Sequence, residues 1–242
     1  MKKTIALLMV LCITASLFAI GSVKVGPAFS FVTGKTRDFE DGDTIYLKTE
    51  TKYKSSGFGF DISGKYELDA TVSAWADFGM VFCAEGKYKS EGQTKWQSVK
   101  EMYESAKKYA DANNGTAKKK LNILTLAAGA AVRLSLATVP VDVSVGGGLF
   151  LDRMFAEVSV SIGNDYEAYT LKATNIGIAG YAEATYMINT EFGVGITMMP
   201  HIGLLNFTTM IETSDEAAYF TRANGFAFSF AMPIVIGVSY NF

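Results

Sequence analysis

The final stretch of the chain, residues 225–242, reads GFAFSFAMPIVIGVSYNF. Every second residue from Phe226 to Phe242 is apolar and most of these residues are large, whereas the residues between them are mostly small. A period of two predicts a β-strand, and this one is far longer than a typical strand of a soluble sandwich. We therefore expect a lipid-facing strand of a transmembrane β-barrel, with Tyr240 and Phe242 at an interfacial aromatic girdle.

An alternating last strand that ends in Phe resembles the C-terminal signature by which outer-membrane β-barrel proteins are recognised by their assembly machinery. The resemblance implies that Tyr240 and Phe242 form an assembly signal and that the barrel-assembly machinery is a partner. The alternative is a soluble β-protein whose last strand is amphipathic, with one face in a core and the other in water.

The N-terminal segment has the pattern of a secretory signal peptide. Lys2 and Lys3 precede an apolar run that extends to residue 18, as in a basic n-region followed by an h-region. We expect residues 1–21 to be removed by cleavage after Ala19 or Gly21, which leaves residues 22–242 as the barrel. A membrane anchor is the alternative, but the run is short for a spanning helix.

Cysteine and charge content exclude several classes of site. After cleavage Cys83 is the only cysteine, so an intrachain disulfide and a Cys-based metal site are excluded. The formal net charge of the full chain is −2, which is not the charge of a nucleic-acid-binding protein. We therefore expect no metal, no cofactor and no nucleic-acid partner.

The whole chain divides into strands with alternating apolar positions. Their alternation alone fits a soluble sandwich as well as a barrel, but the connections alternate between long and short. Long external loops and short periplasmic turns are typical of an up-and-down barrel. We predict an all-β, eight-stranded antiparallel transmembrane β-barrel in the bacterial outer membrane, with both termini periplasmic and strands at 23–32, 57–68, 71–82, 124–136, 141–152, 175–188, 191–202 and 225–242.

The long connections are expected at one end of this barrel. They are residues 34–56, 84–120, 153–174 and 205–224. Helical spacing of apolar residues in 96–112 predicts a short amphipathic helix that ends at Asn113, Asn114 and Gly115. Residues 155–173 predict a protruding hairpin with its turn at 163–165.

The charged residues of the inward-facing registers define the candidate lumen. Eight strands leave an interior just wide enough for side chains, so buried charges there must pair or stay hydrated. Two interpretations remain open: a salt-bridged, plugged lumen, and a narrow polar path through which small solutes pass. The predicted lumen-lining residues are Lys24, Asp61, Lys65, Asp77, Arg133, Asp142, Glu183, Glu191 and His201.

Three prolines fall in strands that become neighbours when the barrel closes: Pro27, Pro200 and Pro233. Proline cannot donate to the hydrogen-bond ladder, and a closed barrel has no edge at which it would be harmless. One interpretation is a local weakness in the wall that serves as a lateral opening for a small apolar molecule. The other is a set of bulges that only bend the wall.

His201 is the only histidine. Hydrolytic catalysis would need a serine and a carboxylate around it, and its neighbours in MMPHIGLLN provide neither. We expect a hydrogen-bonded or solvated residue near the external rim, and no enzyme. The acidic segment 38–43 lacks the ligand spacing of a calcium loop.

The connection 84–120 carries a surplus of lysine, which includes Lys118, Lys119 and Lys120. A basic patch beside a membrane can bind anionic head groups or an acidic partner. The alternative is a solvated charged surface with no partner.

In architecture and terminal Phe242, the chain resembles the small eight-stranded outer-membrane barrels of the OmpA, OmpX and OmpW type. The prolines in the wall and the many inward glycines favour the OmpW type, although no local motif matches residue by residue. That resemblance implies passage of small hydrophobic molecules. We therefore expect a narrow channel for small solutes with lateral release at the prolines, and outer-membrane lipid as a partner. The alternative is a surface interaction or adhesion protein that binds a host ligand through its first three long loops.

Overall fold

The computed structural model describes residues 21–36, 40–41, 44–45, 51–89, 94–135, 140–214 and 218–242. The expected signal peptide, apart from Gly21, lies outside the described residues. No helix in the described ranges is long and apolar enough to cross a membrane.

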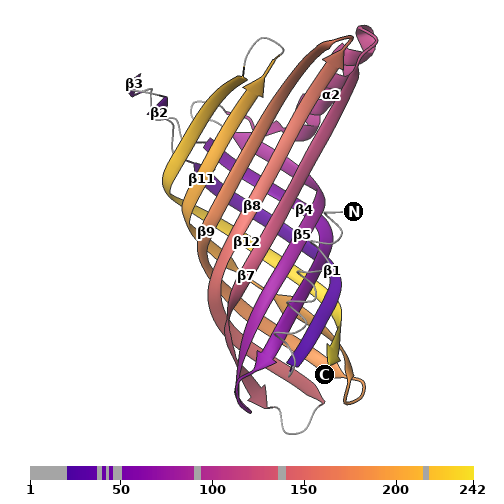
Figure 1. Ribbon diagram of the computed structural model, residues 1–242, viewed down its shortest axis with the longest axis vertical. Coiled ribbons are helices and arrows are strands. Elements are labelled where there is room, and N and C mark those ends of the chain that lie inside the picture. Colours follow the sequence, from indigo (N-terminus) through magenta and orange to yellow (C-terminus); the bar gives the residue numbers. More distant parts are fainter. Residues whose placement is uncertain are drawn as a thin grey trace.

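The described residues form one antiparallel sheet that closes on itself as a ring of eight strands (Figure 1). Each wall strand pairs with the next, and the last strand pairs with the first. The seventh wall strand is made of two successive segments, β10 and β11, which both lie between β9 and β12. The wall strands are β1 (Gly21–Thr36), β4 (Thr51–Glu67), β5 (Val72–Lys89), β7 (Thr116–Ser135), β8 (Val141–Ile162), β9 (Asp165–Met187), β10 (Phe192–Met198), β11 (His201–Thr213) and β12 (Ala218–Asn241). The predicted eight-stranded barrel is therefore confirmed.

The two ends of the barrel differ. At one end, which we call the short-turn end, Asp69 and Asn189 close tight turns by accepting hydrogen bonds from the backbone N–H groups that follow them. Gly21 and Phe242 meet at this end, where Phe242 N donates to Gly21 O at 3.0 Å. The opposite end, which we call the loop end, carries the hairpin of β8 and β9, the connection between β11 and β12, and the helix (Figure 1).

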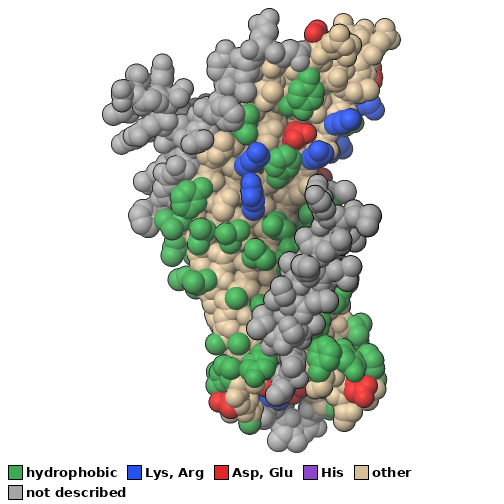
Figure 2. All heavy atoms as spheres, viewed as in Figure 1, with side chains coloured by type: hydrophobic (Ala, Val, Ile, Leu, Met, Phe, Trp, Pro, Cys, Tyr) green, Lys and Arg blue, Asp and Glu red, His purple; other side chains and the backbone are tan. Residues whose placement is uncertain are grey.

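The outer wall is covered by exposed apolar side chains (Figure 2). Phe58 is 72% exposed and Leu149 is 69% exposed, which would be costly in water for so many residues but is favourable in lipid. At the short-turn end Tyr240 packs against Phe192 and Phe242, with ring centroids 5.1 and 5.0 Å apart. These aromatic rings occupy the position expected of an interfacial girdle.

Several strand boundaries differ from the sequence prediction. The prediction of a loop at 205–224 is wrong, because β11 continues to Thr213 and β12 begins at Ala218. Lys118, Lys119 and Lys120 lie on β7 and not in a loop. The β4 strand begins at Thr51, within the predicted first loop. Apolar alternation ends at the edge of the lipid band, whereas backbone pairing continues beyond it.

The predicted helix is present as α2 (Val99–Ala112) at the loop end. Ser98 and Glu101 form a capping box, and Asn114 takes a positive φ of 55° where the helix ends. The short strand β6 (Gln97–Ser98) pairs with the upper part of β5, beyond the last pair between β5 and β7 at Phe82. The remaining short strands, β2 (Glu40–Asp41) and β3 (Thr44–Ile45), pair with each other.

The helix packs on upper strand residues that face the lumen. Tyr88 donates a hydrogen bond to Met102 Sδ at 3.3 Å, and a Cβ at Gly86 would meet Val99 and Leu121 at 3.0 and 3.1 Å. Ala110 is fully buried. Because Gly86 and Leu121 are buried on the inner face of the sheet, α2 covers part of the upper lumen.

Candidate functional site: a buried charged plug in the lumen

Glu183 on β9 is the centre of a charged network that crosses the lumen. Its two oxygens bind two ammonium groups: Lys24 Nζ on β1 at 2.8 Å and Lys65 Nζ on β4 at 2.7 Å. Tyr181 also donates to Glu183, at 2.6 Å. Lys24 donates to Thr197 on β10 at 2.8 Å. All five side chains are buried. Because β1 and β4 are not neighbours of β9 in the sheet, the network connects opposite parts of the wall.

A second pair of carboxylates lies beside this network. Asp61 and Asp77 are buried on β4 and β5, on adjacent strands whose register places them two residues apart. The Trp75 ring stacks on the Tyr181 ring at 4.7 Å between centroids and 18° between planes. Charges and large rings therefore fill this section of the barrel, which we call the plug and define as Lys24, Asp61, Lys65, Trp75, Asp77, Tyr181, Glu183 and Thr197.

The side chain of His201 is fully buried, and its Nδ1 lies 3.1 Å from Asp152 Oδ2. Phe150 stacks on the imidazole with centroids 4.3 Å apart. The expectation that His201 lies near the rim is wrong, because β11 continues from His201 to Thr213 toward the loop end. The pair adds a polar layer above the plug, since His201 follows Thr197 along the seventh wall strand.

A further polar cluster connects three strands above His201. Tyr53 and Asn206 both donate to Asn175 Oδ1, at 3.0 and 2.6 Å. Thr208 donates to Asn206 Oδ1 at 2.6 Å. The sequence prediction missed Tyr53 and Asn206 as lumen residues because it placed both in loops. The only sequence feature that could have placed them in the lumen is the presence of polar residues at every second position.

The upper lumen is mainly apolar. Its buried residues form one cluster that includes Tyr53 from the polar layer below and lies under α2. The members of this upper apolar cluster are Val32, Tyr53, Val81, Leu121, Ile123, Met154, Ala156, Ala173 and Ala231. The lumen thus changes from charged near the short-turn end to apolar near the loop end.

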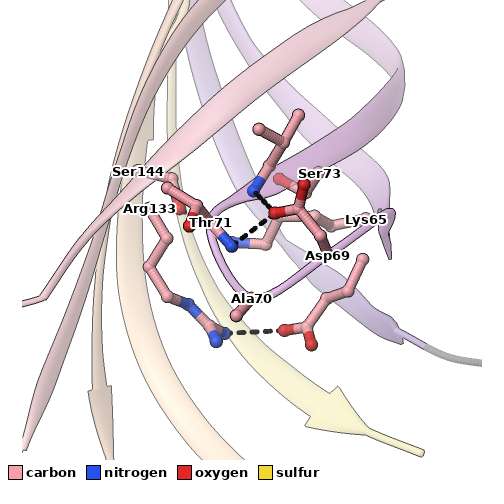
Figure 3. A pocket seen from close by; sticks show the side chains of 9 residues that line it. Lys65, Asp69, Ala70, Thr71, Ser73, Arg133 and Ser144 are labelled. Atoms are coloured by element: carbon pink, nitrogen blue, oxygen red, sulfur yellow. Dashed lines mark hydrogen bonds and ion pairs between the residues drawn. The ribbon is translucent and has the colours of Figure 1, made fainter.

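The short-turn end opens into a vestibule of about 210 Å³ whose lining includes Lys65, Glu183 and Arg133. Arg133 Nη2 lies 2.7 Å from Glu67 Oε1 (Figure 3). It lies 3.6 Å from Asp142 Oδ2. Arg133 and Asp142 are partly exposed, so they border the mouth and not the sealed interior. The plug separates this vestibule from the upper lumen.

Glu191 does not line the lumen. It is exposed in the turn before β10, where its backbone N donates to Asn189 Oδ1 at 2.9 Å. Its inward register holds only if the strand extends to residue 191, and β10 begins at Phe192.

The wall ladder is interrupted where the prolines were predicted to matter. β10 ends at Met198 and β11 begins at His201, which leaves Pro200 between them. Met199 N donates to Pro233 O at 3.0 Å and Gly180 N to Pro200 O at 2.7 Å. On the other side of β12, pairing with β1 skips from Val25 to Ala28 and so omits Pro27.

Among the described residues no group of three or more His, Cys, Asp or Glu side chains is arranged to hold a metal ion. Glu183 binds lysine, tyrosine and threonine, and Asp152 lies beside His201.

No family model and no curated protein sequence matches this chain. Its fold is similar to solved outer-membrane structures. The outer membrane protein OprG from Pseudomonas aeruginosa has a TM-score of 0.52 and 11% identity, over 92% of this chain and 96% of that chain. A major outer membrane protein from Thermus thermophilus has a TM-score of 0.51 and 13% identity, over 89% and 99%. The outer membrane protease OmpT from Escherichia coli has a TM-score of 0.50 and 8% identity, over 93% and 97%.

These likenesses show the fold: the chain is a β-barrel of the small outer-membrane type. They include both a protease and proteins whose names state no catalytic activity. The fold by itself therefore does not decide between enzymatic and non-enzymatic roles.

Proposed function

We propose that this outer-membrane barrel takes up small apolar molecules at its loop end and releases them sideways into the membrane. The observation that carries the proposal is the contrast along the lumen: the section near the loop end is mainly apolar, the section near the short-turn end is a buried, charged plug, and two uncharged or paired polar layers lie between them. Such a barrel is not an open pore for polar solutes, because the plug residues fill its lower section.

The plug sets where a molecule would have to leave. An apolar solute gains by leaving water for the apolar upper section, at about 0.8 kcal/mol per buried CH₂ group. It cannot replace the hydrogen bonds of Glu183, Lys24 and Lys65, and separating buried charges from their partners costs several kcal/mol per ion. Descent through the lower section is therefore blocked for such a solute.

The interruption in the wall lies just above the plug. Thr197 is the plug residue on the seventh wall strand, and Pro200 follows it after two residues toward the loop end. Pro200 and Pro233 both lack the N–H that a ladder needs. Fewer hydrogen bonds have to break here than elsewhere, so β10, β11 and β12 are the strands at which we place the lateral exit.

Catalysis is not part of the proposal. Within the described residues, the one hydrogen-bond partner of His201 is Asp152, and His201 Nε2 has no hydroxyl partner that could act as a nucleophile. We assign the Asp152–His201 pair a structural role in the closed interior of the barrel.

The test combines two measurements on refolded protein. In planar bilayers we expect no sustained salt conductance. In liposomes we expect the protein to accelerate transfer of a small fluorescent apolar dye from water into the bilayer, and the Pro200→Ala/Pro233→Ala variant to slow it severalfold by restoring ladder donors. Pro140→Ala is the matched control, because Pro140 directly precedes β8 and lies outside the wall strands. A steady ohmic conductance, or equal dye transfer by wild type and the double variant, would contradict lateral release.

A second candidate is binding of a host ligand by the loop end. The observation that favours it is that β8 and β9 extend to a turn at Gly163, where Tyr166 and Tyr169 are exposed. Exposed tyrosines are common anchors of interfaces. Grafting the described hairpin 155–173 onto an unrelated barrel should transfer binding if this role is correct.

A further inference from the structure

The outer face of β7, β8 and β9 changes from apolar to basic at one level. Below that level the outward residues are Leu126 and Leu124 on β7, Leu149 and Leu151 on β8, and Ile178 and Ile176 on β9. Above it the next outward residues are polar or charged on all three strands. The level therefore marks the border between the lipid-facing band and the loop end of the barrel.

Three cations occupy register positions near Phe155 at this border. Phe155 on β8 is paired in register with Lys172 on β9, and Arg153 lies two residues below Phe155 on the same face. Lys120 on β7 is paired with Glu157, two residues above Phe155. Directly opposed residues have Cβ atoms about 4.5–5.5 Å apart and diagonal ones about 7–8 Å. Long cationic side chains at these positions can reach one common group.

The orientation of these side chains follows from their neighbours. Asp152 and Met154 are buried inside the barrel, so Arg153 between them points outward and is exposed. Ala173 is buried on the inner face, which turns Lys172 outward as well. Figure 2 shows Lys and Arg side chains gathered on the upper part of this face, above the apolar band.

Two of the three cations have no counter-ion in the part of the chain that the structure describes. Among the described residues, no ion pair joins Arg153 or Lys172 to a carboxylate. Lys120 Nζ lies 3.9 Å from Glu157 Oε1, at the outer limit of an ion pair. The site thus presents more positive charge than its own acid neutralises.

We propose that Arg153, Lys172 and Lys120 bind the phosphate of a phosphomonoester-bearing lipid whose acyl chains lie along Leu149, Leu151 and Ile176. The guanidinium of arginine matches a phosphate with two parallel hydrogen bonds, and lysine adds a mobile charge. Acyl chains on the apolar band below hold the headgroup at the height of the cations. This site is independent of the transport proposal, because it lies on the outside of the wall.

Native mass spectrometry of the refolded protein in neutral detergent tests the site. With equal amounts of phosphatidic acid and a phosphatidylcholine of the same chains, wild type should retain mainly phosphatidic acid. The Arg153→Gln/Lys172→Gln variant should retain at least fivefold less phosphatidic acid than wild type. Lys107→Gln/Lys108→Gln on α2 removes the same charge from exposed positions and should keep it.

Two further arms separate a specific site from general attraction. Glu157→Gln removes the acid beside Lys120 and should increase retention, whereas a merely structural role for Glu157 would leave retention unchanged or lower it. The bound phosphatidic acid is also challenged with two competitors, inorganic phosphate and unlabelled phosphatidic acid. If inorganic phosphate displaced the lipid as effectively as the unlabelled lipid does, the acyl contacts would be refuted. Equal retention by wild type and the Arg153/Lys172 variant would overturn the proposal. Should that variant fail to fold, Lys172→Gln alone must still lower retention, and added salt must release the lipid from wild type.

Discussion

Lys24 Nζ lies 2.8 Å from Glu183 Oε2, and this ion pair joins β1 to β9 across the interior of the barrel. The two strands are not neighbours in the sheet, so the contact depends on the tertiary fold. Lys65 holds the other oxygen of the same carboxylate at 2.7 Å. Two buried ammonium groups thus share one carboxylate.

Replacing Glu183 with glutamine should strongly destabilise the barrel. The amide keeps the shape of the side chain but leaves the ammonium groups of Lys24 and Lys65 without their shared anion. Removing one partner of a buried ion pair typically costs about 3–5 kcal/mol. Urea unfolding in detergent micelles should show a lower midpoint for Glu183→Gln, whereas Glu104→Gln, at an exposed position on α2, should unfold like wild type.

The Asp152–His201 contact should appear as a coupling energy in a double-mutant cycle. Asp152→Leu leaves His201 Nδ1 without its acceptor, and His201→Phe leaves the buried carboxylate without its partner. Each single change should destabilise the barrel, and the double variant should cost less than the sum by about 0.5–3 kcal/mol. Strictly additive free energies of unfolding would mean that the 3.1 Å contact contributes nothing.

Ala110→Asp should release α2 without opening the barrel. Ala110 is a fully buried residue of α2, so a carboxylate there would lose its hydration or push the helix away from the strands. Hydrogen exchange in residues 99–112 should become fast while exchange in the wall strands stays slow. Ala112→Asp places the same charge at an exposed position of the same helix and should leave exchange slow. Parallel loss of protection in the strands would show that α2 does not unfold separately.

The turn at Asp69 should give the barrel a small acid-sensitive contribution to stability. Backbone N–H groups of Thr71 and Val72 donate to its carboxylate at 2.7 Å, and they hold the pKa of Asp69 below its usual value of 3.8. Because the folded pKa is the lower one, this stabilisation is complete above the unfolded pKa and is lost as the pH falls through the folded pKa.

Asp69→Asn tests this directly, since Asn189 already closes the equivalent turn with an uncharged oxygen. The difference in unfolding midpoint between wild type and Asp69→Asn should therefore shrink as the pH falls below the usual pKa of Asp69. A difference that stays constant across that range would show that the charge of Asp69 does not stabilise the turn.

The alternation of the sequence predicted the wall because side chains in a strand point to opposite faces with a period of two. That rule placed Lys24, Lys65, Asp61, Asp77, Glu183 and His201 on the inner face, where the structure has them. It failed for Glu191, since the rule holds only within a strand and Asn189 ends the pairing there. The alternation thus predicts which face of the sheet a side chain lies on, but it does not predict where each strand begins and ends.

Partners within the lumen could not be predicted in the same way. The contacts of Glu183 with Lys24 and Lys65 depend on the tilt and stagger of strands far apart in sequence. The register also shifts between Ser56 and Phe58 and between Gly203 and Leu205, and each shift changes which residues face each other. A sequence pattern contains no signal for such shifts, so the Tyr53–Asn175–Asn206 cluster became visible only in three dimensions.

The meeting of Phe242 N with Gly21 O has a consequence for how the protein folds. The seam between β1 and β12 joins residues at opposite ends of the described chain, so closing it requires an ordering of almost the whole sequence. Folding rates fall steeply as contacts become less local. We therefore expect closure of this seam to limit the folding rate, and substitutions in β1 or β12 to slow refolding more than equally destabilising changes in the local hairpin of β8 and β9.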